Sequence, residues 1–230
     1  MKIFAIADTH LSGNPPAKPM SIFGAHWEGH WEKIKTSWQE QVSSQDIVLL
    51  AGDISWAMKL PDALVDLDAI ASLPGRKIMV RGNHDYWWQT LSKMNKAVDG
   101  KIEFLNNNFA PAGEWAICGS RGWTCPEDPL FTASDQPIFD RELLRVEASL
   151  HAARTAGFTR LILMLHFPPF YDADSTAGFA GLIAKYNVKI CIYGHLHGEA
   201  IKSAATGTMG DTTYHLVSCD ALSFAIKQII

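Results

Sequence analysis

The sequence predicts an α/β protein, because runs typical of buried strands alternate with segments of helical period. The runs are short and rich in Ile, Val and Leu, so each is predicted to be a strand covered on both faces. They lie at residues 3–7, 47–51, 77–80, 115–119, 161–165 and 189–193. Strands that alternate with helices in this way indicate a sheet with helices packed on it.

Apolar residues at helical spacing predict helices between several of these strands. Trp27, Trp31, Ile34 and Trp38 mark the first helix, and further helices are expected at residues 60–71, 86–98 and 141–156. Residues 212–218 and 224–230 are predicted strands with little helix between them, so part of the sheet should be antiparallel or mixed. Three segments rich in Pro, Gly or Asn are predicted loops around a site, at 12–25, 106–113 and 125–137.

The composition predicts one soluble domain that spans residues 1–230. The chain has 230 residues, of which 47% are hydrophobic, enough for a substantial core. Its 20 basic and 24 acidic side chains give a net charge of -4 without long runs of either sign, so no extended nucleic acid partner is expected. No apolar run approaches the roughly 20 residues of a membrane span, and the first is too short for a signal peptide. We therefore expect a cytoplasmic protein with reduced cysteines.

Polar side chains that can bind metals or transfer protons follow five of the predicted strands. They are Asp8 and His10 after the first, Asp53 after Gly52, the run Gly82-Asn83-His84-Asp85, His166, and the pair His195 and His197 after Gly194. Ligands bind outside the carboxyl ends of the strands in open α/β sheets, so these residues should meet at one edge. The sequence therefore predicts a single crowded site.

The ligand set mixes oxygen and nitrogen without thiolate, which suits Mn, Fe, Zn, Co or Ni better than Mg or Ca. Asp8 and His10, like His195 and His197, are two residues apart and can point to the same side of an extended segment. A single histidine is more often a core or capping residue than a ligand. The joint occurrence at five strand ends favours a metal site, whereas His26, His30, His151 and His215 fit the ordinary interpretation.

This ordered set of motifs resembles the calcineurin-like metallophosphoesterase family, and most closely its small bacterial branch of predicted phosphohydrolases. The resemblance spans most of the chain, and no liganding position is substituted. It implies a sandwich of two mixed β-sheets flanked by helices in four αββα layers. It also implies that Asp8, His10 and His197 hold one metal and that Asn83, His166 and His195 hold the other, with Asp53 bridging the two.

We expect such a site to hold two divalent or trivalent transition-metal ions. The predicted reaction is hydrolysis of a phosphoester by in-line attack of a hydroxide held between the metals. His84, beside the expected ligand Asn83, is the candidate to stabilise the transition state or to protonate the leaving oxygen. Asp85 is a candidate to orient the His84 imidazole, and alternatively the cap of a helix that starts near Tyr86.

Two further residues are candidates for substrate contacts. Arg121 could clamp a phosphate oxygen through its planar guanidinium, although most arginines serve only the surface. His30 is a candidate for the rim of the site, whereas the neighbouring Trp27 and Trp31 fit a core stripe. Trp56 is assigned no role.

The leading hypothesis is a phosphomonoesterase or phosphodiesterase that acts on a small molecule, such as a nucleotide or another phosphorylated metabolite. One alternative is cleavage of a lipid-linked pyrophosphate, as in the related UDP-diacylglucosamine pyrophosphatases, which would require an apolar acyl groove. The acidic balance disfavours a nuclease, and a protein phosphatase stays open. The last alternative is a non-catalytic scaffold with the same fold, which the intact ligand set disfavours.

Overall fold

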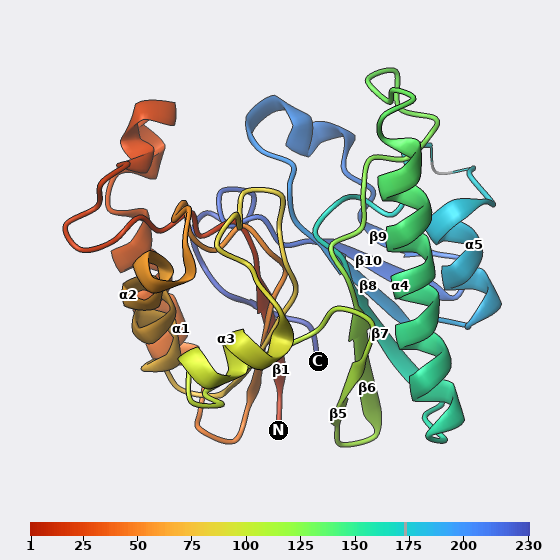
Figure 1. Ribbon diagram of the computed structural model, residues 1–230, viewed down its shortest axis with the longest axis horizontal. Helices are drawn as coiled ribbons and strands as arrows, with labels where there is room; N and C mark the ends of the chain where they lie inside the picture. Colours follow the sequence, from red (N-terminus) through yellow and green to blue (C-terminus); the bar gives the residue numbers. More distant parts are fainter. Residues whose placement is uncertain (173) are drawn as a thin grey trace.

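Two β-sheets pack face to face between two groups of helices in the computed structural model, which describes residues 1–172 and 174–230 (Figure 1). The strands are β1 (Ile3–Ile6), β2 (Ile47–Leu50), β3 (Arg76–Met79), β4 (Ile102–Phe104), β5 (Phe109–Ala112), β6 (Trp115–Gly119), β7 (Arg160–Met164), β8 (Ile190–Tyr193), β9 (Gly207–Met209), β10 (Thr212–Leu216) and β11 (Lys227–Gln228). The α-helices are α1 (His30–Gln41), α2 (Leu60–Ala71), α3 (Leu91–Ala97), α4 (Gln136–Thr155) and α5 (Gly178–Lys185). The 3₁₀ helices are η1 (Met20–Phe23), η2 (Ala25–Trp27) and η3 (Gly198–Ser203).

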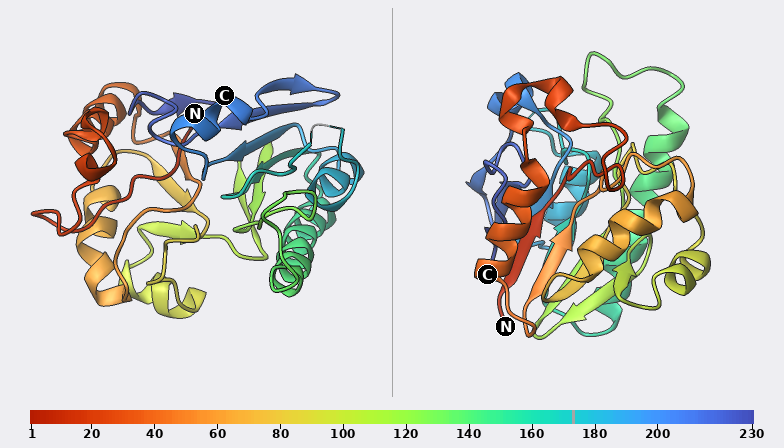
Figure 2. Two further views of the ribbon diagram at one scale, coloured as in Figure 1. Left: turned by 90° about the horizontal axis from the view of Figure 1, so that it is seen from above. Right: turned by 90° about the vertical axis from the view of Figure 1, so that its left-hand side faces the viewer.

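Both sheets are mixed, as expected. The first sheet has the order β11-β1-β2-β3-β4, and the second has the order β5-β6-β7-β8-β10-β9. Strands β1 to β4 are parallel to one another, as are β6, β7, β8 and β10, whereas β11, β5 and β9 are antiparallel strands at the sheet edges. Helices α1, α2 and α3 cover the first sheet, and α4 and α5 cover the second (Figure 2). The four αββα layers are confirmed.

Side chains alternate along the strands between two separate hydrophobic layers. In β1, Phe4 and Ile6 pack toward the helices of the first sheet, while Ile3 and Ala5 face the second sheet. Successive strand residues point to opposite faces, so a strand buried on both faces is apolar throughout. This is why short continuous apolar runs predicted β1, β2, β3, β6, β7 and β8 within one residue of their bounds.

Three predictions about the elements were wrong. The segment 106–113 contains β5 instead of being only a loop, because Pro111 is tolerated on an edge strand. The helix expected from residue 86 begins at Leu91, and the preceding residues form a turn in which the Trp87 indole donates to Asp85. Helix α5, which contains two glycines, was not predicted.

The carboxyl ends of the parallel strands lie at one edge of both sheets, at the top in Figure 1. The segments η1, η2 and η3 lie above the same edge. Residues that follow β1, β2, β3, β7 and β8 are therefore brought together there. Among the described helices, none is both long and apolar enough to cross a membrane.

Candidate metal centre

The seven predicted metal ligands all lie at this edge, each directly after its strand. Asp8, His10, Asp53 and His166 are buried, and the others are partly exposed at the surface of the site: Asn83, His195 and His197. The structure therefore brings together the residues that the strand-end pattern singled out.

One group of ligand atoms consists of Asp8, His10 and His197. The Nε2 atom of His197 lies 3.4 Å from Oδ1 of Asp8, and Nε2 of His10 lies 4.0 Å from the same oxygen. One ligand atom from each residue lies within 4.8 Å of the others, a spacing that suits a shared cation. This is the set that the family resemblance implied for one metal.

A second group surrounds His166. Its Nε2 atom lies 2.7 Å from Oδ1 of Asn83 and 3.5 Å from Oδ2 of Asp53, and Nδ1 of His195 lies 3.0 Å from the same Asn83 oxygen. Asp8 also belongs to this group, together with Asp53 and His166. The two groups therefore share a carboxylate and form one continuous site.

Each of the two central carboxylates uses one oxygen for the backbone and keeps the other for the site. Oδ2 of Asp8 accepts a hydrogen bond from the backbone N–H of His195, and Oδ1 of Asp53 accepts one from that of His84. The remaining Oδ2 of Asp53 lies 3.5 Å from His166 and 4.0 Å from His10, which belong to different groups. Asp53 is thus positioned between the two groups.

The donor atoms fit a pair of cations on chemical grounds. Oδ1 of Asp8 is buried without a hydrogen-bond partner, which is costly unless a cation uses such an atom. The Nδ1 atom of His166 lies 3.0 Å from the Ala51 carbonyl oxygen, to which it donates as an N–H. Its Nε2 then directs a lone pair at the Asn83 oxygen, and a cation bound by both atoms would stabilise that contact.

The protonation equilibria of His10, His195 and Asp8 also suit metal binding, which requires neutral imidazoles and ionised carboxylates. Burial lowers the pKa of His10 to about 3 and that of His195 to about 3. Burial opposes ionisation of Asp8, but the nearby imidazoles of His197, His166 and His10 hold its pKa below the ordinary value. Burial and the nearby carboxylates of Asp85 and Asp8 raise the pKa of Asp53 to about 7. The carboxylates repel one another, and a cation removes that repulsion.

Strained backbone surrounds the site. The φ angles of Asp8, His10, Asp53 and His195 are +60°, +47°, +53° and +73°, in the left-handed region that most side chains avoid. Such conformations cost of order 1–3 kcal/mol each and cluster at functional sites. The surrounding contacts must therefore hold these residues in place.

Two glycines permit the close approach of the ligand loops. A Cβ atom at Gly82 would lie 2.0 Å from Oδ1 of Asp53, and one at Gly194 would lie 2.4 Å from Oδ2 of Asp8. Neither glycine has a positive φ angle, so what each position requires is space for the neighbouring carboxylate.

Comparison with protein-family models matches residues 1–199 to the calcineurin-like phosphoesterase family. The chain belongs to this family. A comparison with curated proteins found no match.

The solved structures that resemble this phosphoesterase share its fold at low sequence identity. TT1561 of Thermus thermophilus aligns with a TM-score of 0.58 at 12% identity, over 98% of this chain and 96% of that chain. AQ665 from Aquifex aeolicus, a protein of unknown function, aligns with a TM-score of 0.52 at 16% identity, over 99% and 95%. The calcineurin-like phosphoesterase YfkN from Bacillus subtilis aligns with a TM-score of 0.53 at 14% identity, over 95% and 81%. At such identities the likeness shows the fold alone.

A cavity of about 390 Å³ in this phosphoesterase opens onto the ligands. His84 lies in its wall, with its ring 4.5 Å from that of Trp56 and 5.9 Å from that of His10. Trp56 also stacks on His10 at 4.7 Å, so it borders the site, a position that its place three residues after Asp53 could have indicated. His84 is therefore close to the ligands without being one of either group.

Asp85 does not orient His84 in this structure, and that prediction was wrong. Its two oxygens accept hydrogen bonds from five N–H groups, those of the Asp53, Ile54, Ser55 and Gly82 backbone and of the Trp87 indole. The carboxylate is fully buried and joins the loops that follow β2 and β3. It is also not a helix cap, because α3 begins at Leu91.

The side chains of Arg121 and His30 both contact other residues of the protein. Nη2 of Arg121 lies 3.4 Å from Oε1 of the buried Glu142 on α4, and its guanidinium covers the Trp123 ring at 4.3 Å. A phosphate clamp by Arg121 is therefore not formed in this structure. Nε2 of His30 lies 2.9 Å from the Thr9 carbonyl oxygen and holds the loop beside His10.

Asp220 is a site residue that no sequence motif marks. Its Oδ1 lies 2.8 Å from Nδ1 of His197, and its Oδ2 accepts from the Gly198 backbone at 3.2 Å. Burial opposes protonation of His197, but its hydrogen bond to Asp220 and the nearby carboxylate of Asp8 raise its pKa to about 10. Asp220 follows the predicted strand 212–218 by two residues, and this placement is the signal that could have identified it.

Replacing Asp220 by Ala should weaken metal binding at Asp8, His10 and His197. A carboxylate that accepts from the second ring nitrogen of a ligand histidine fixes its orientation, and its loss typically costs about 10- to 100-fold in metal affinity. Chelator competition with Mn²⁺ or Zn²⁺ measures the change. Asp220→Asn should recover part of the affinity, and Asp211→Ala, an exposed carboxylate, is the control. Equal affinity in the wild type and Asp220→Ala would show that His197 needs no such partner.

Proposed function

We propose that this chain is a dinuclear metal-dependent phosphohydrolase that cleaves phosphate monoesters or diesters of a small molecule. The observation that carries the proposal is that the two groups of candidate ligands share the carboxylate of Asp8. The unpartnered Asp8 oxygen and the lone pair of His166 that faces Asn83 support it, because a cation would stabilise both. Membership of the calcineurin-like phosphoesterase family gives the reaction class.

Asp8, His10 and His197 would hold one ion, Asn83, His166 and His195 would hold the other, and Asp53 would bridge them. The mixed oxygen and nitrogen donors suit Mn, Fe, Zn, Co or Ni. When bound, two such ions lower the pKa of a water, orient the phosphate and offset negative charge on the attacking and leaving oxygens. The buried walls of the site exclude competing solvent and keep this electrostatic effect strong.

His84 is the proposed catalytic residue outside the ligand set. Its backbone N–H is anchored to Oδ1 of Asp53, so its position is tied to the bridging carboxylate. Trp56 packs beside its ring, which lies in the wall of the cavity. From there the imidazole can stabilise charge on the phosphoryl oxygens or protonate the leaving oxygen.

Asp53→Asn should reduce the occupancy of both metals. The neutral amide can still accept the hydrogen bond from His84, but it removes the negative charge from the position between the two groups. Elemental analysis of the purified protein measures the occupancy. Asp46→Asn is a matched control, because Asp46 is a buried carboxylate at the other end of β2. Two full equivalents of metal in Asp53→Asn would rule out a bridging role.

His84→Ala should lower turnover by roughly two to four orders of magnitude, the usual contribution of a general acid-base group, while the metal content persists. Turnover of an activated phosphoester together with elemental analysis separates the two effects. His151→Ala, an exposed histidine on α4, should leave both unchanged. A His84→Ala enzyme with the wild-type rate would remove this residue from the mechanism.

The function itself is tested by a metal-supplemented screen that compares phosphate monoesters, diesters, cyclic nucleotides and pyrophosphates. We expect hydrolysis of small monoesters or diesters that depends on added Mn²⁺ or a similar ion. Preference for a lipid-linked pyrophosphate would replace the proposed substrate class. Absence of both bound metal and turnover would instead indicate a non-catalytic scaffold.

A further inference from the structure

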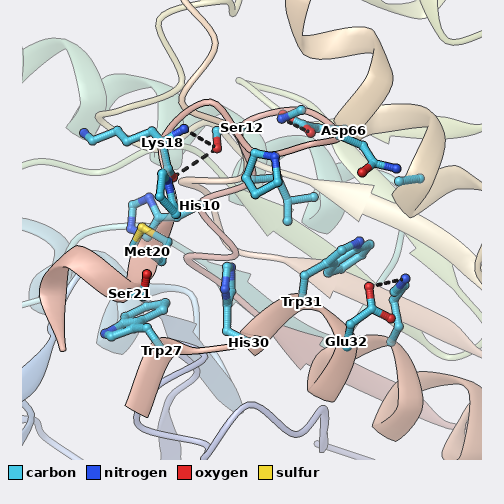
Figure 3. Close-up of a pocket in the computed structure, with 18 of the residues that line it drawn as sticks. His10, Ser12, Lys18, Met20, Ser21, Trp27, His30, Trp31, Glu32 and Asp66 are labelled. Atoms are coloured by element: carbon cyan, nitrogen blue, oxygen red, sulfur yellow. Dashed lines mark hydrogen bonds and ion pairs between the residues drawn. The ribbon is translucent and has the colours of Figure 1, made fainter. Parts of the chain in front are cut away.

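A second cavity, of about 540 Å³, lies beside the metal site between the loop 12–21, the start of α1 and helix α2 (Figure 3). It is larger than the cavity over the ligands, and the two share His10, Met20 and Trp27 in their walls. Figure 3 shows these three side chains on one side of the cavity, with Trp31 and Asp66 across from them. A group bound here would lie next to a phosphate at the metal site.

The wall offers flat apolar surfaces. Trp31 is only partly buried and lines the cavity, so it is not purely a core residue as its helical spacing predicted. Trp27 and Met20 are buried at the shared wall, and Pro16 and Pro19 come from the loop. Indole faces and a thioether are good surfaces for a planar ligand.

Two polar side chains of the wall, those of Asp66 and Ser12, already have partners within the protein. Oδ1 of Asp66 accepts from the Gly13 backbone at 2.8 Å, and its Oδ2 accepts from the Ser55 hydroxyl at 2.5 Å. The Ser12 hydroxyl contacts both the backbone N–H and the carbonyl of Lys18 at 3.0 Å. A ligand rich in hydroxyls, such as a sugar, needs many free polar side chains, and these two are already engaged. Stacking is the better-supported mode of recognition.

The charges of the wall do not favour a second phosphate. The cavity is bordered by the acidic residues Glu28, Glu32 and Asp66 and by Lys18 and Lys35. Lys35 is paired with Glu32 at 2.7 Å, and the Lys18 ammonium lies over the Trp56 ring, 3.2 Å from its centroid, on the side of the metal site. The cavity therefore suits a neutral group better than a second phosphate.

We propose that this cavity binds the heteroaromatic base of a nucleotide-like substrate whose phosphate lies at the metal site. The proposal rests on the function proposed above and specifies its substrate class. Bases stack on aromatic side chains, and each stacked base contributes about 1–3 kcal/mol, which corresponds to roughly 5- to 150-fold in affinity.

The test measures adenosine, which has no phosphate, by saturation-transfer NMR and by quenching of tryptophan fluorescence. We expect saturable binding to the wild type. Val65→Trp should weaken it about tenfold or more, because Val65 lies on α2 in the far wall of the cavity and an indole there fills the space. Trp31→Leu should weaken it similarly by removing a stacking surface. Leu144→Trp, an exposed position on α4, is the matched control and should bind adenosine normally.

A second readout is the ratio of kcat/KM for AMP to kcat/KM for methyl phosphate. This ratio should fall about tenfold in Val65→Trp and Trp31→Leu. Absence of adenosine binding to the wild type, or binding that Val65→Trp leaves unchanged, overturns the base site. Hydrolysis of methyl phosphate without adenosine binding refutes the base site and leaves the proposed function intact. Adenosine binding that both variants weaken, without hydrolysis of any phosphoester, refutes the proposed function and leaves the cavity assignment intact.

Discussion

Five N–H groups converge on the buried carboxylate of Asp85, and the geometry of the metal site depends on that interaction. The carboxylate joins the residues after β2 to those after β3, so it fixes the positions of Asp53 and of the loop that carries Asn83 and His84. Asp53 has a left-handed backbone that is unfavourable in isolation. Hydrogen bonds to an ionised group are roughly twice as strong as neutral ones, so several of them can hold a strained segment. The ligands are thus organised by the protein itself.

The sequence predicted where the candidate ligands lie because their placement follows a simple physical rule. Strands buried on both faces are continuous apolar runs, and their carboxyl ends meet at one edge. The role of Asp85 could not be predicted in this way, because a carboxylate that accepts from backbone N–H groups looks the same in sequence as one that orients a histidine. Arg121 likewise follows a strand, and its pairing depends on Glu142, which a helix brings to it. Asp220 obeys the strand-end rule but lacks a motif, and β5 was hidden by Pro111.

The charge balance of the site explains why it requires cations. Asp8, Asp53 and Asp85 are buried close together, and burying an ionised carboxylate costs several kcal/mol unless it is paired. Asp85 is satisfied by its five donors, whereas Asp8 keeps an unpartnered oxygen. Arg121 is paired with Glu142, and so it does not neutralise the centre. His10 and His195 supply little positive charge, since burial keeps both neutral by lowering the pKa of each. Two metal ions would supply what the side chains lack.

The residues of the wall between the two cavities contribute both to the proposed metal site and to the space for the substrate. His10 is a candidate metal ligand on one side and part of the larger cavity on the other, and His30 holds the preceding residue, Thr9, by its carbonyl. Met20 completes the wall, and a thioether adapts readily to a neighbouring group. The residues that set the position of the metal at His10 therefore also border the space for the rest of the substrate. A group that fills this space can align its phosphate with the metals, because binding energy from a non-reacting part of a substrate can be used to orient the reacting part.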